Sequence, residues 1–383
     1  MDPWFTARDD DNLMKKKQSI TYAQVGDNYD TKDPIKKLAQ VSARQTAQNL
    51  TAKGLKEISD SRGESAFVWS INKDTFLASV IEGLGTKNLV ADAMQNITGK
   101  TYYDIIGHDT IATIINDLVT VGADPMVAHA YWGIENNDWL QDEKRMTDLI
   151  SGWKSGCNIA GATWGGGETP TLKGIIHPKT VMLGGSAIGI INSKERLITD
   201  NGLKDGDRII LIKSNGINAN GLSLARAIAL KLKDGYATKL PSGILYGDAL
   251  LTKTNIYAKL VQDLLDKEIK IHYISNITGH GHRKLMRSMK DFTYVVENIL
   301  EPQELFTFIQ QRAGLTDYQM YDEYNMGMDY AMFLSKDDTG RIQEVIASNG
   351  FESIDAGYIK AGERQVVIEP KNITFKGETL DLR

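Results

Sequence analysis

Short apolar runs bounded by turn residues predict β-strands at several points along the chain, at residues 75–81, 126–132, 182–191 and 208–213. Residues 105–121 and 140–155 instead repeat apolar side chains with the period of an α-helix. Further helices are predicted at 223–232, 256–266 and 302–313, and further strands near 269–274, 293–296, 330–334 and 365–368. This alternation predicts a mixed α and β fold.

The length of the chain indicates more than one domain. At about 150 residues per domain, 383 residues make two or three. The clearest boundary is near residues 191–201, where a predicted strand gives way to polar turn residues. We therefore expect an N-terminal domain at 19–192 and a C-terminal α/β domain at 193–383. Residues 1–18 are polar and lack the apolar core of a signal peptide, so we expect a disordered leader there.

Composition and charge exclude several classes of protein. A net charge of −5 and a pI near 5.8 argue against a nucleic-acid-binding surface, which needs clustered Lys and Arg. No apolar run approaches the roughly 20 residues that span a bilayer. The single cysteine, Cys157, has no partner for a disulfide within the chain. We expect a cytoplasmic protein that binds neither nucleic acid nor membrane.

Two segments of the N-terminal half are candidate ligand sites. One is a glycine-containing turn with polar residues, and the other is the polar face of a predicted helix. The first runs from Glu82 through Gly83, Gly85 and Thr86 to Lys87; it is either a tight turn or a loop whose N–H groups and lysine approach an anion. It lacks the spacing of a P-loop. The second is one face of helix 105–121, where Asp109, Thr113, Asn116 and Thr120 align and Asp117 lies nearby. This face is either solvated or an oxygen site for Mg²⁺, and it carries no Lys or Arg.

Three other segments are rich in glycine and polar side chains. Gly165, Gly166 and Gly167 precede Glu168 and Thr169, an arrangement that suits either a flexible loop or backbone lying against a ligand. Residues 214–221 directly precede a predicted helix, whose N-terminus is a favourable place for a phosphate. Residues 278–283 contain His280 and His282, which lack the support of other metal-ligand spacing.

Taken in order, these segments resemble the aminoimidazole ribonucleotide synthetase (phosphoribosylformylglycinamidine cyclo-ligase) family over residues 22–369. Residues 22–30 are similar to the family's Y-x-x-x-G-x-x-x-D, and residues 82–87 to D-G-x-G-T-K. Residues 104–125 follow D-x-x-G-x-D-x-x-A-x-x-x-N-D-L-x-x-x-G-A-x-P nearly throughout and are the most specific match. Residues 166–169 match G-G-E-T, residues 214–226 follow S-x-G-x-x-x-N-G-x-S-L-x-R, and residues 254–257 match T-x-I-Y.

The resemblance implies a two-domain synthetase fold and a homodimer in which the N-terminal domains pair into a β-barrel. It also implies a reaction that uses ATP and Mg²⁺ to close the imidazole ring of formylglycinamidine ribonucleotide through a phosphorylated amide oxygen. Catalytic roles would fall to Lys87, Asp109 and Glu168. Metal ligands would be Glu82, Asp109, Asn116 and Asp117; other nucleotide contacts would be Gly83, Gly85, Thr86, Lys87, Gly167 and Thr169; substrate contacts would be Ser214, Asn220, Gly221, Thr278, Gly279 and Arg287. We expect Glu82, Asp109, Asn116 and Glu168 to meet in one cleft.

Several positions depart from the family pattern. Glu82 replaces an aspartate, and Asn218 replaces a histidine. The family's T-G-G-G-L-x-x-N-L-P-R becomes T-G-H-G-H-R-K-L-M-R at residues 278–287, one residue shorter, and F-N-C-G-V-G-M becomes Y-N-M-G-M-D-Y at residues 324–330. Two alternatives therefore stay open: a related ATP-dependent enzyme that activates an amide of another substrate, and a nucleotide-binding regulatory relative without turnover.

Overall fold

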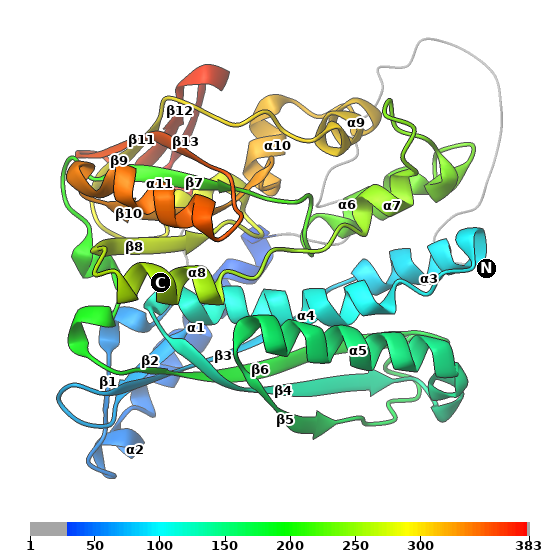
Figure 1. The fold of residues 1–383 in the computed structure, drawn as a ribbon, viewed down its shortest axis with the longest axis horizontal. Helices are drawn as coiled ribbons and strands as arrows, with labels where there is room; N and C mark the ends of the chain where they lie inside the picture. Colours follow the sequence, from blue (N-terminus) through cyan, green and yellow to red (C-terminus); the bar gives the residue numbers. More distant parts are fainter. Residues whose placement is uncertain (1–28, 381–383) are drawn as a thin grey trace.

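The computed structural model describes residues 29–380, which form two β-sheets with helices packed on and between them (Figure 1). The leader expected at residues 1–18 lies outside the described residues. None of the helices in residues 29–380 has both the length and the apolar character that crossing a membrane requires.

The first sheet belongs to the N-terminal half and has the strand order β1-β2-β3-β6-β4-β5. Its strands are β1 (Lys56–Glu57), β2 (Phe67–Ser70), β3 (Phe76–Gly83), β4 (Asp124–Ile134), β5 (Thr163–Glu168) and β6 (Val181–Ile191). All neighbours pair antiparallel except β4 and β5. The sheet of this single chain is open, with β1 and β5 at its edges, so the barrel expected for a dimer stays a prediction.

Two long helices, α4 (Tyr103–Leu118) and α5 (Glu143–Ala160), cover one face of this sheet (Figure 1). They approach each other closely, because a Cβ placed at Gly152 would lie 2.0 Å from the carbonyl oxygen of Asp104. Helix α3 (Lys87–Thr98) precedes them, and α1 (Tyr29–Gln45) and α2 (Gln48–Thr51) come first in the described chain. Helix α4 lies between the first sheet and the C-terminal half, and most of its side chains are buried.

The second sheet belongs to the C-terminal half and has the order β13-β12-β9-β11-β7-β10-β8, antiparallel apart from the β9–β12 pair. Its strands are β7 (Arg208–Lys213), β8 (Ile271–Asn276), β9 (Phe292–Val296), β10 (Met328–Leu334), β11 (Ser353–Ala361), β12 (Gln365–Ile368) and β13 (Ile373–Lys376). The helices of this half are α6 (Leu222–Ala229), α7 (Tyr246–Leu250), α8 (Ala258–Asp266), α9 (Glu304–Ala313), α10 (Asp317–Glu323) and α11 (Thr339–Ser348).

The predicted mixed α and β class is confirmed, and each predicted strand and helix has a counterpart in the structure. The domain limits at 19–192 and 193–383 stay a prediction. The remaining helices and strands were not predicted: α1, α2, α3, α7, α10, α11, β1, β2, β11 and β13. Residues 163–168, expected as part of a glycine-rich passage, form the edge strand β5.

Candidate active site

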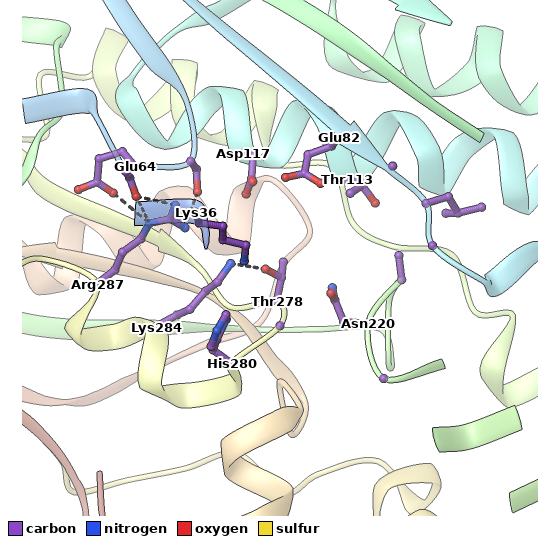
Figure 2. A pocket seen from close by; sticks show the side chains of 18 of the residues that line it. Lys36, Glu64, Glu82, Thr113, Asp117, Asn220, Thr278, His280, Lys284 and Arg287 are labelled. Atoms are coloured by element: carbon purple, nitrogen blue, oxygen red, sulfur yellow. Dashed lines mark hydrogen bonds and ion pairs between the residues drawn. The ribbon is translucent and has the colours of Figure 1, made fainter. Parts of the chain in front are cut away.

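A pocket of about 780 Å³ lies between the two halves of the chain (Figure 2). The first sheet and α4 supply part of its wall, segments that follow β7 and β8 supply another part, and α1 contributes Lys36 and Gln40. The predicted site residues that line it are Glu82, Gly83, Gly85, Thr86, Asp117, Asn220, Gly221, Thr278, Gly279 and Arg287.

Two helices begin at this pocket. Strand β3 ends at Gly83, and the turn through Gly85, with a φ of +74°, leads to Thr86 at the start of α3. Gly221, with a φ of +80°, precedes α6. Both turns line the pocket, and neither helix start has a side-chain cap. Because the first N–H groups of a helix have no partner within it, these two starts present donors suited to phosphate oxygens.

Two carboxylates from the N-terminal half face the pocket. Glu82 comes from the end of β3 and Asp117 from the last turn of α4 (Figure 2). Burial, with a further contribution from the negative charge of Asp117, raises the pKa of Glu82 to about 7. Asp117 is held by a 2.7 Å hydrogen bond from the amide of Asn276. No group of three acidic, histidine or cysteine side chains able to hold a metal occurs within residues 29–380.

This donor set suits Mg²⁺ bound together with a nucleotide. Mg²⁺ prefers oxygen ligands and is usually held by one or two carboxylates, while phosphate oxygens and water complete its coordination. Two carboxylates whose charges disfavour each other are a favourable place for a divalent cation, because the cation neutralises both.

Four long cationic side chains also line the pocket. Arg287 forms an ion pair with Glu64 and donates to the carbonyl of Gly63 and the hydroxyl of Ser65. Arg62 and Lys36 pair with Glu57 and Asp33, respectively. The fourth, Lys284, donates a hydrogen bond to the hydroxyl of Thr278. Burial and the charge of Arg287 lower the pKa of Lys284 to about 8. The sequence did not single out Lys284, because it lies in the shortened segment 278–287.

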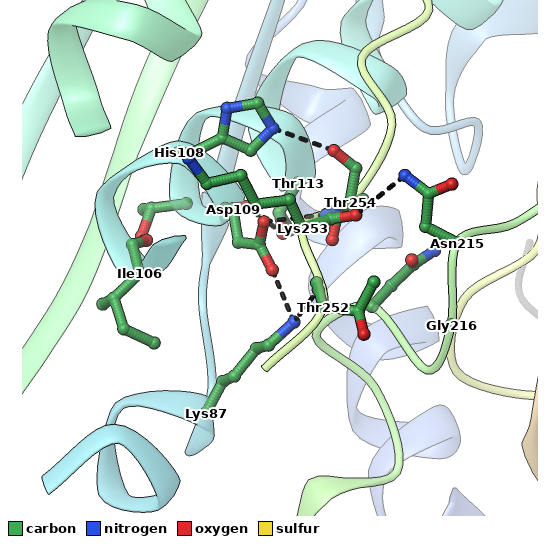
Figure 3. Close-up of polar contacts among 12 residues, drawn as sticks. Lys87, Ile106, His108, Asp109, Thr113, Asn215, Gly216, Thr252, Lys253 and Thr254 are labelled. Atoms are coloured by element: carbon green, nitrogen blue, oxygen red, sulfur yellow. Dashed lines mark hydrogen bonds and ion pairs between the residues drawn. The ribbon is translucent and has the colours of Figure 1, made fainter. Parts of the chain in front are cut away.

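Lys87 was expected at the phosphates and Asp109 at the metal, but neither lines the pocket. Figure 3 shows that their side chains point toward each other. Their side chains are fully buried, and the lysine Nζ lies 2.5 Å from the Asp109 Oδ2. Nζ also donates to the carbonyl of Thr252 at 2.9 Å, and the other carboxylate oxygen accepts from the N–H of Thr254 at 2.9 Å. In this chain the pair therefore connects α3 and α4 to the segment 252–257 of the C-terminal half.

Asn116 and His108 belong to the same connection. The Asn116 amide donates to the carbonyl of Asn255 at 2.8 Å, and its oxygen accepts from the N–H of Tyr257 at 2.9 Å. The His108 Nε2 lies 2.9 Å from the carbonyl oxygen of Thr254. We call the contacts of Lys87, His108, Asp109 and Asn116 with residues 252–257 the α4 clamp. Asp109 and Asn116 were expected to hold a metal. In this structure the Asp109 carboxylate accepts from Lys87 and from the N–H of Thr254, and the Asn116 amide bonds to backbone groups, so their role at a metal stays a prediction.

The remaining predicted residues are also outside the pocket. The buried Ser214 donates to the carbonyl of Gly216. Gly167, Glu168 and Thr169 are exposed at and just beyond the end of edge strand β5. The expected meeting of Glu82, Asp109, Asn116 and Glu168 in one cleft therefore does not occur within this chain: only Glu82 lines the pocket.

The positions that depart from the family pattern have structural roles nearby. His280 adopts a left-handed backbone conformation, with a φ of +68°, and lies 3.3 Å from the Asp33 carboxylate. His282 is buried, lies 3.0 Å from the carbonyl of Asn325, and burial lowers its pKa to about 4. The Asn218 amide donates a 2.7 Å hydrogen bond to the carboxylate of Asp329, which lies in the altered segment 324–330, so these two departures from the family pattern contact each other.

Comparisons with known proteins agree with this architecture. Residues 63–191 match the model for the N-terminal domain of AIR synthase related proteins, and residues 204–369 match the model for the C-terminal domain. The phosphoribosylformylglycinamidine cyclo-ligase of Methanothermobacter thermautotrophicus is 32% identical over 311 residues, which cover 81% of this chain and 86% of the relative. The cyclo-ligase of Caldicellulosiruptor saccharolyticus is 33% identical over 306 residues, covering 78% and 85%.

A solved structure shares the fold at much lower identity. The hydrogenase maturation protein HypE in complex with ATP superimposes with a TM-score of 0.53 at 15% identity, covering 69% of this chain and 76% of that one. The likeness extends over both halves of the fold.

Proposed function

The chain belongs to the AIR synthase related family, and from this premise we propose that it is a phosphoribosylformylglycinamidine cyclo-ligase that uses ATP to close an imidazole ring. Its substrate would be formylglycinamidine ribonucleotide and its product aminoimidazole ribonucleotide. The observation that supports the proposal best is the pocket between the halves, where two carboxylates face two helix starts.

The reaction has two stages. The amide oxygen of the formyl group forms a bond to the γ-phosphorus of ATP while the bond to the β–γ bridging oxygen breaks, and ADP leaves. The amidine nitrogen then attacks the activated carbon, and phosphate departs with the former amide oxygen. Phosphoryl transfer of this kind depends on in-line positioning and charge neutralisation rather than on a protein nucleophile.

We assign the pocket residues to these needs as follows. Glu82 and Asp117 would hold Mg²⁺, which when bound would neutralise charge on the phosphates. The turn from Gly83 to Thr86 would bind phosphate oxygens through its N–H groups. The substrate would lie against Asn220, Gly221, Thr278, Gly279 and Arg287 on the opposite wall. Lys87, Asp109 and Asn116 would act as positioning residues, since the α4 clamp fixes α3 and α4 against the C-terminal half.

A homodimer is part of the proposal and is supported by the outer face of the first sheet. Ile81, Tyr131 and Met182 all have side chains that are at least 37% exposed. The register of β3, β4 and β6 places these three on the face opposite α4 and α5. An exposed apolar sheet face of this kind is a favourable surface for a second copy. We propose that Gly167, Glu168 and Thr169 act in that dimer, from the exposed end of β5.

The decisive experiment is to incubate the protein with ATP, Mg²⁺ and formylglycinamidine ribonucleotide and to measure aminoimidazole ribonucleotide and ADP. We expect both products. Glu82→Gln should raise the Mg²⁺ concentration that activity requires and should lower turnover, whereas the exposed Glu344→Gln should behave as wild type. ADP release with another amide, but no aminoimidazole product, would favour the substrate-shifted alternative. No ADP release with any amide would favour the regulatory one.

The proposed dimer is tested separately, by sedimentation. Met182→Lys should shift the protein toward monomer. A cytoplasmic location stays a prediction.

A further inference from the structure

We propose that Lys284 is the catalytic lysine of the pocket and binds the phosphoryl group while it passes from ATP to the amide oxygen. The proposal rests on the function proposed above. It assigns a role to a residue that the family motif does not contain: counting back from Arg287, Lys284 stands where T-G-G-G-L-x-x-N-L-P-R has its asparagine.

The position of Lys284 between the two groups of pocket residues is the first argument. Its side chain points into the pocket beside Thr278, on the wall assigned to substrate (Figure 2). It lines the same pocket as Glu82 and Asp117, the carboxylates assigned to the metal, and their negative charges act on its ammonium group. A cation in this place can contact the γ-phosphoryl group as it passes from the nucleotide to the substrate.

The second argument is that the Lys284 ammonium is available. Each of the other three long cations of the pocket already has a carboxylate partner, Glu64, Glu57 or Asp33. Within residues 29–380, no carboxylate lies within ion-pair distance of Lys284, and its hydrogen bond goes to the neutral hydroxyl of Thr278. An ammonium group has three donors, so it retains the capacity to bind an incoming oxygen.

The third argument is burial. Lys284 is only 7% exposed, whereas the side chain of Lys36 on the same pocket is 51% exposed. A fixed charge in a water-poor environment stabilises developing charge far more than one in water. Lys87, the other candidate for this role, is fully buried against Asp109 and does not line the pocket.

Lys284 keeps its proton during the step that it assists. The amide oxygen forms the new O–P bond, the bond between phosphorus and the β–γ bridging oxygen breaks, and ADP leaves with that electron pair. The phosphoryl group keeps its three peripheral oxygens throughout, and the ammonium of Lys284 donates a hydrogen bond to one of them. Because the interaction strengthens as charge spreads over these oxygens, it should affect kcat more than nucleotide binding.

The test compares Lys284→Met with Lys284→Arg, Lys284→Asn and a surface control, Lys213→Met. For each protein, kcat and both KM values are measured with ATP and formylglycinamidine ribonucleotide, and the Kd for ADP and for the Mg²⁺-free nucleotide is measured by calorimetry. We expect Lys284→Met to lower kcat by about 100-fold or more, as for removal of a single transition-state donor, with nucleotide Kd values within a few-fold of wild type. Arg should restore part of the rate, and Lys213→Met should change nothing.

Two outcomes overturn the inference. The first is a Lys284→Met protein whose kcat stays within about threefold of wild type, since a transition-state donor is worth much more than that. The second is an effect confined to the KM of the ribonucleotide, with kcat kept, which would make Lys284 a substrate-binding residue. Thermal unfolding of each variant separates a loss of fold from a loss of rate. If wild type itself makes no aminoimidazole ribonucleotide, it is the proposed function that fails.

Discussion

Replacing Lys87 with methionine should destabilise the protein strongly, because it leaves the carboxylate of Asp109 buried without a counter-ion. The ammonium and carboxylate lie 2.5 Å apart, both side chains are 0% exposed, and the lysine also donates to the carbonyl of Thr252. Removing one partner of a buried ion pair costs about 3–5 kcal/mol. The N–H of Thr254 still donates to the carboxylate, but one hydrogen bond does not replace the lost charge.

Urea denaturation followed by far-UV circular dichroism measures this loss directly. We expect the midpoint to fall in Lys87→Met, and to recover by more than half when Asp109→Leu is added, because the double variant no longer buries an isolated charge. Lys213→Met is the matched control: its ion pair with Glu352 has exposed partners and should contribute less than about 1 kcal/mol.

The same variants distinguish a structural role of Lys87 from a catalytic one. If Lys87→Met lost less than about 1 kcal/mol of stability while kcat fell by orders of magnitude, the reasoning from burial would be refuted and Lys87 would act on the phosphates instead. We expect the reverse, a large loss of stability that accounts for any loss of turnover.

Three further predictions follow from buried or crowded positions. Burial raises the pKa of Asp329 to about 6, so the folded protein holds a proton there that the unfolded chain has already lost. The free energy of unfolding should therefore fall by up to roughly 3 kcal/mol as the pH rises from about 4 to about 6. Urea denaturation over this pH range should show the fall in wild type and not in Asp329→Asn. Burial raises the pKa of the Cys157 thiol to about 11, so a thiol reagent at pH 8 should react fast only after denaturation, and rapid reaction of native protein would contradict the burial. Gly152→Ala should lower the free energy of unfolding, measured by urea denaturation, by about 1–3 kcal/mol because its Cβ would meet the Asp104 backbone, whereas Gly340→Ala, in open space on α11, should be neutral or slightly stabilising.

The sequence predicted elements best where a local pattern was sufficient. Strand β7 has the predicted limits because an apolar run stands between two turn clusters, and α4 begins within two residues of its predicted start. Strand β11 escaped because its residues Ser353–Ala361 mix polar and apolar side chains without clear alternation. The sequence therefore predicts individual helices and strands better than it predicts which elements pack against one another.

The site was predictable only in part for the same reason. Glu82 and Asp117 line the pocket as the motifs suggested, whereas Asp109 turns to backbone 145 positions away, which no local pattern can reveal. The polar face of α4 did carry a signal, since it lacks Lys and Arg, and its burial against the other half explains why. Lys284 lay hidden because the segment around it is one residue shorter than the family motif.

The α4 clamp has a consequence for how this protein can change over generations. The buried carboxylate of Asp109 is satisfied by the ammonium of Lys87 on α3 and by the N–H of Thr254, so the contact depends both on that lysine and on the backbone path of the segment 252–257. A hybrid gene that joins the first half of this chain to the second half of a distant relative should fold only where the donor keeps the same local path. We expect the halves to be inherited as a matched set, with recombination between them selected against.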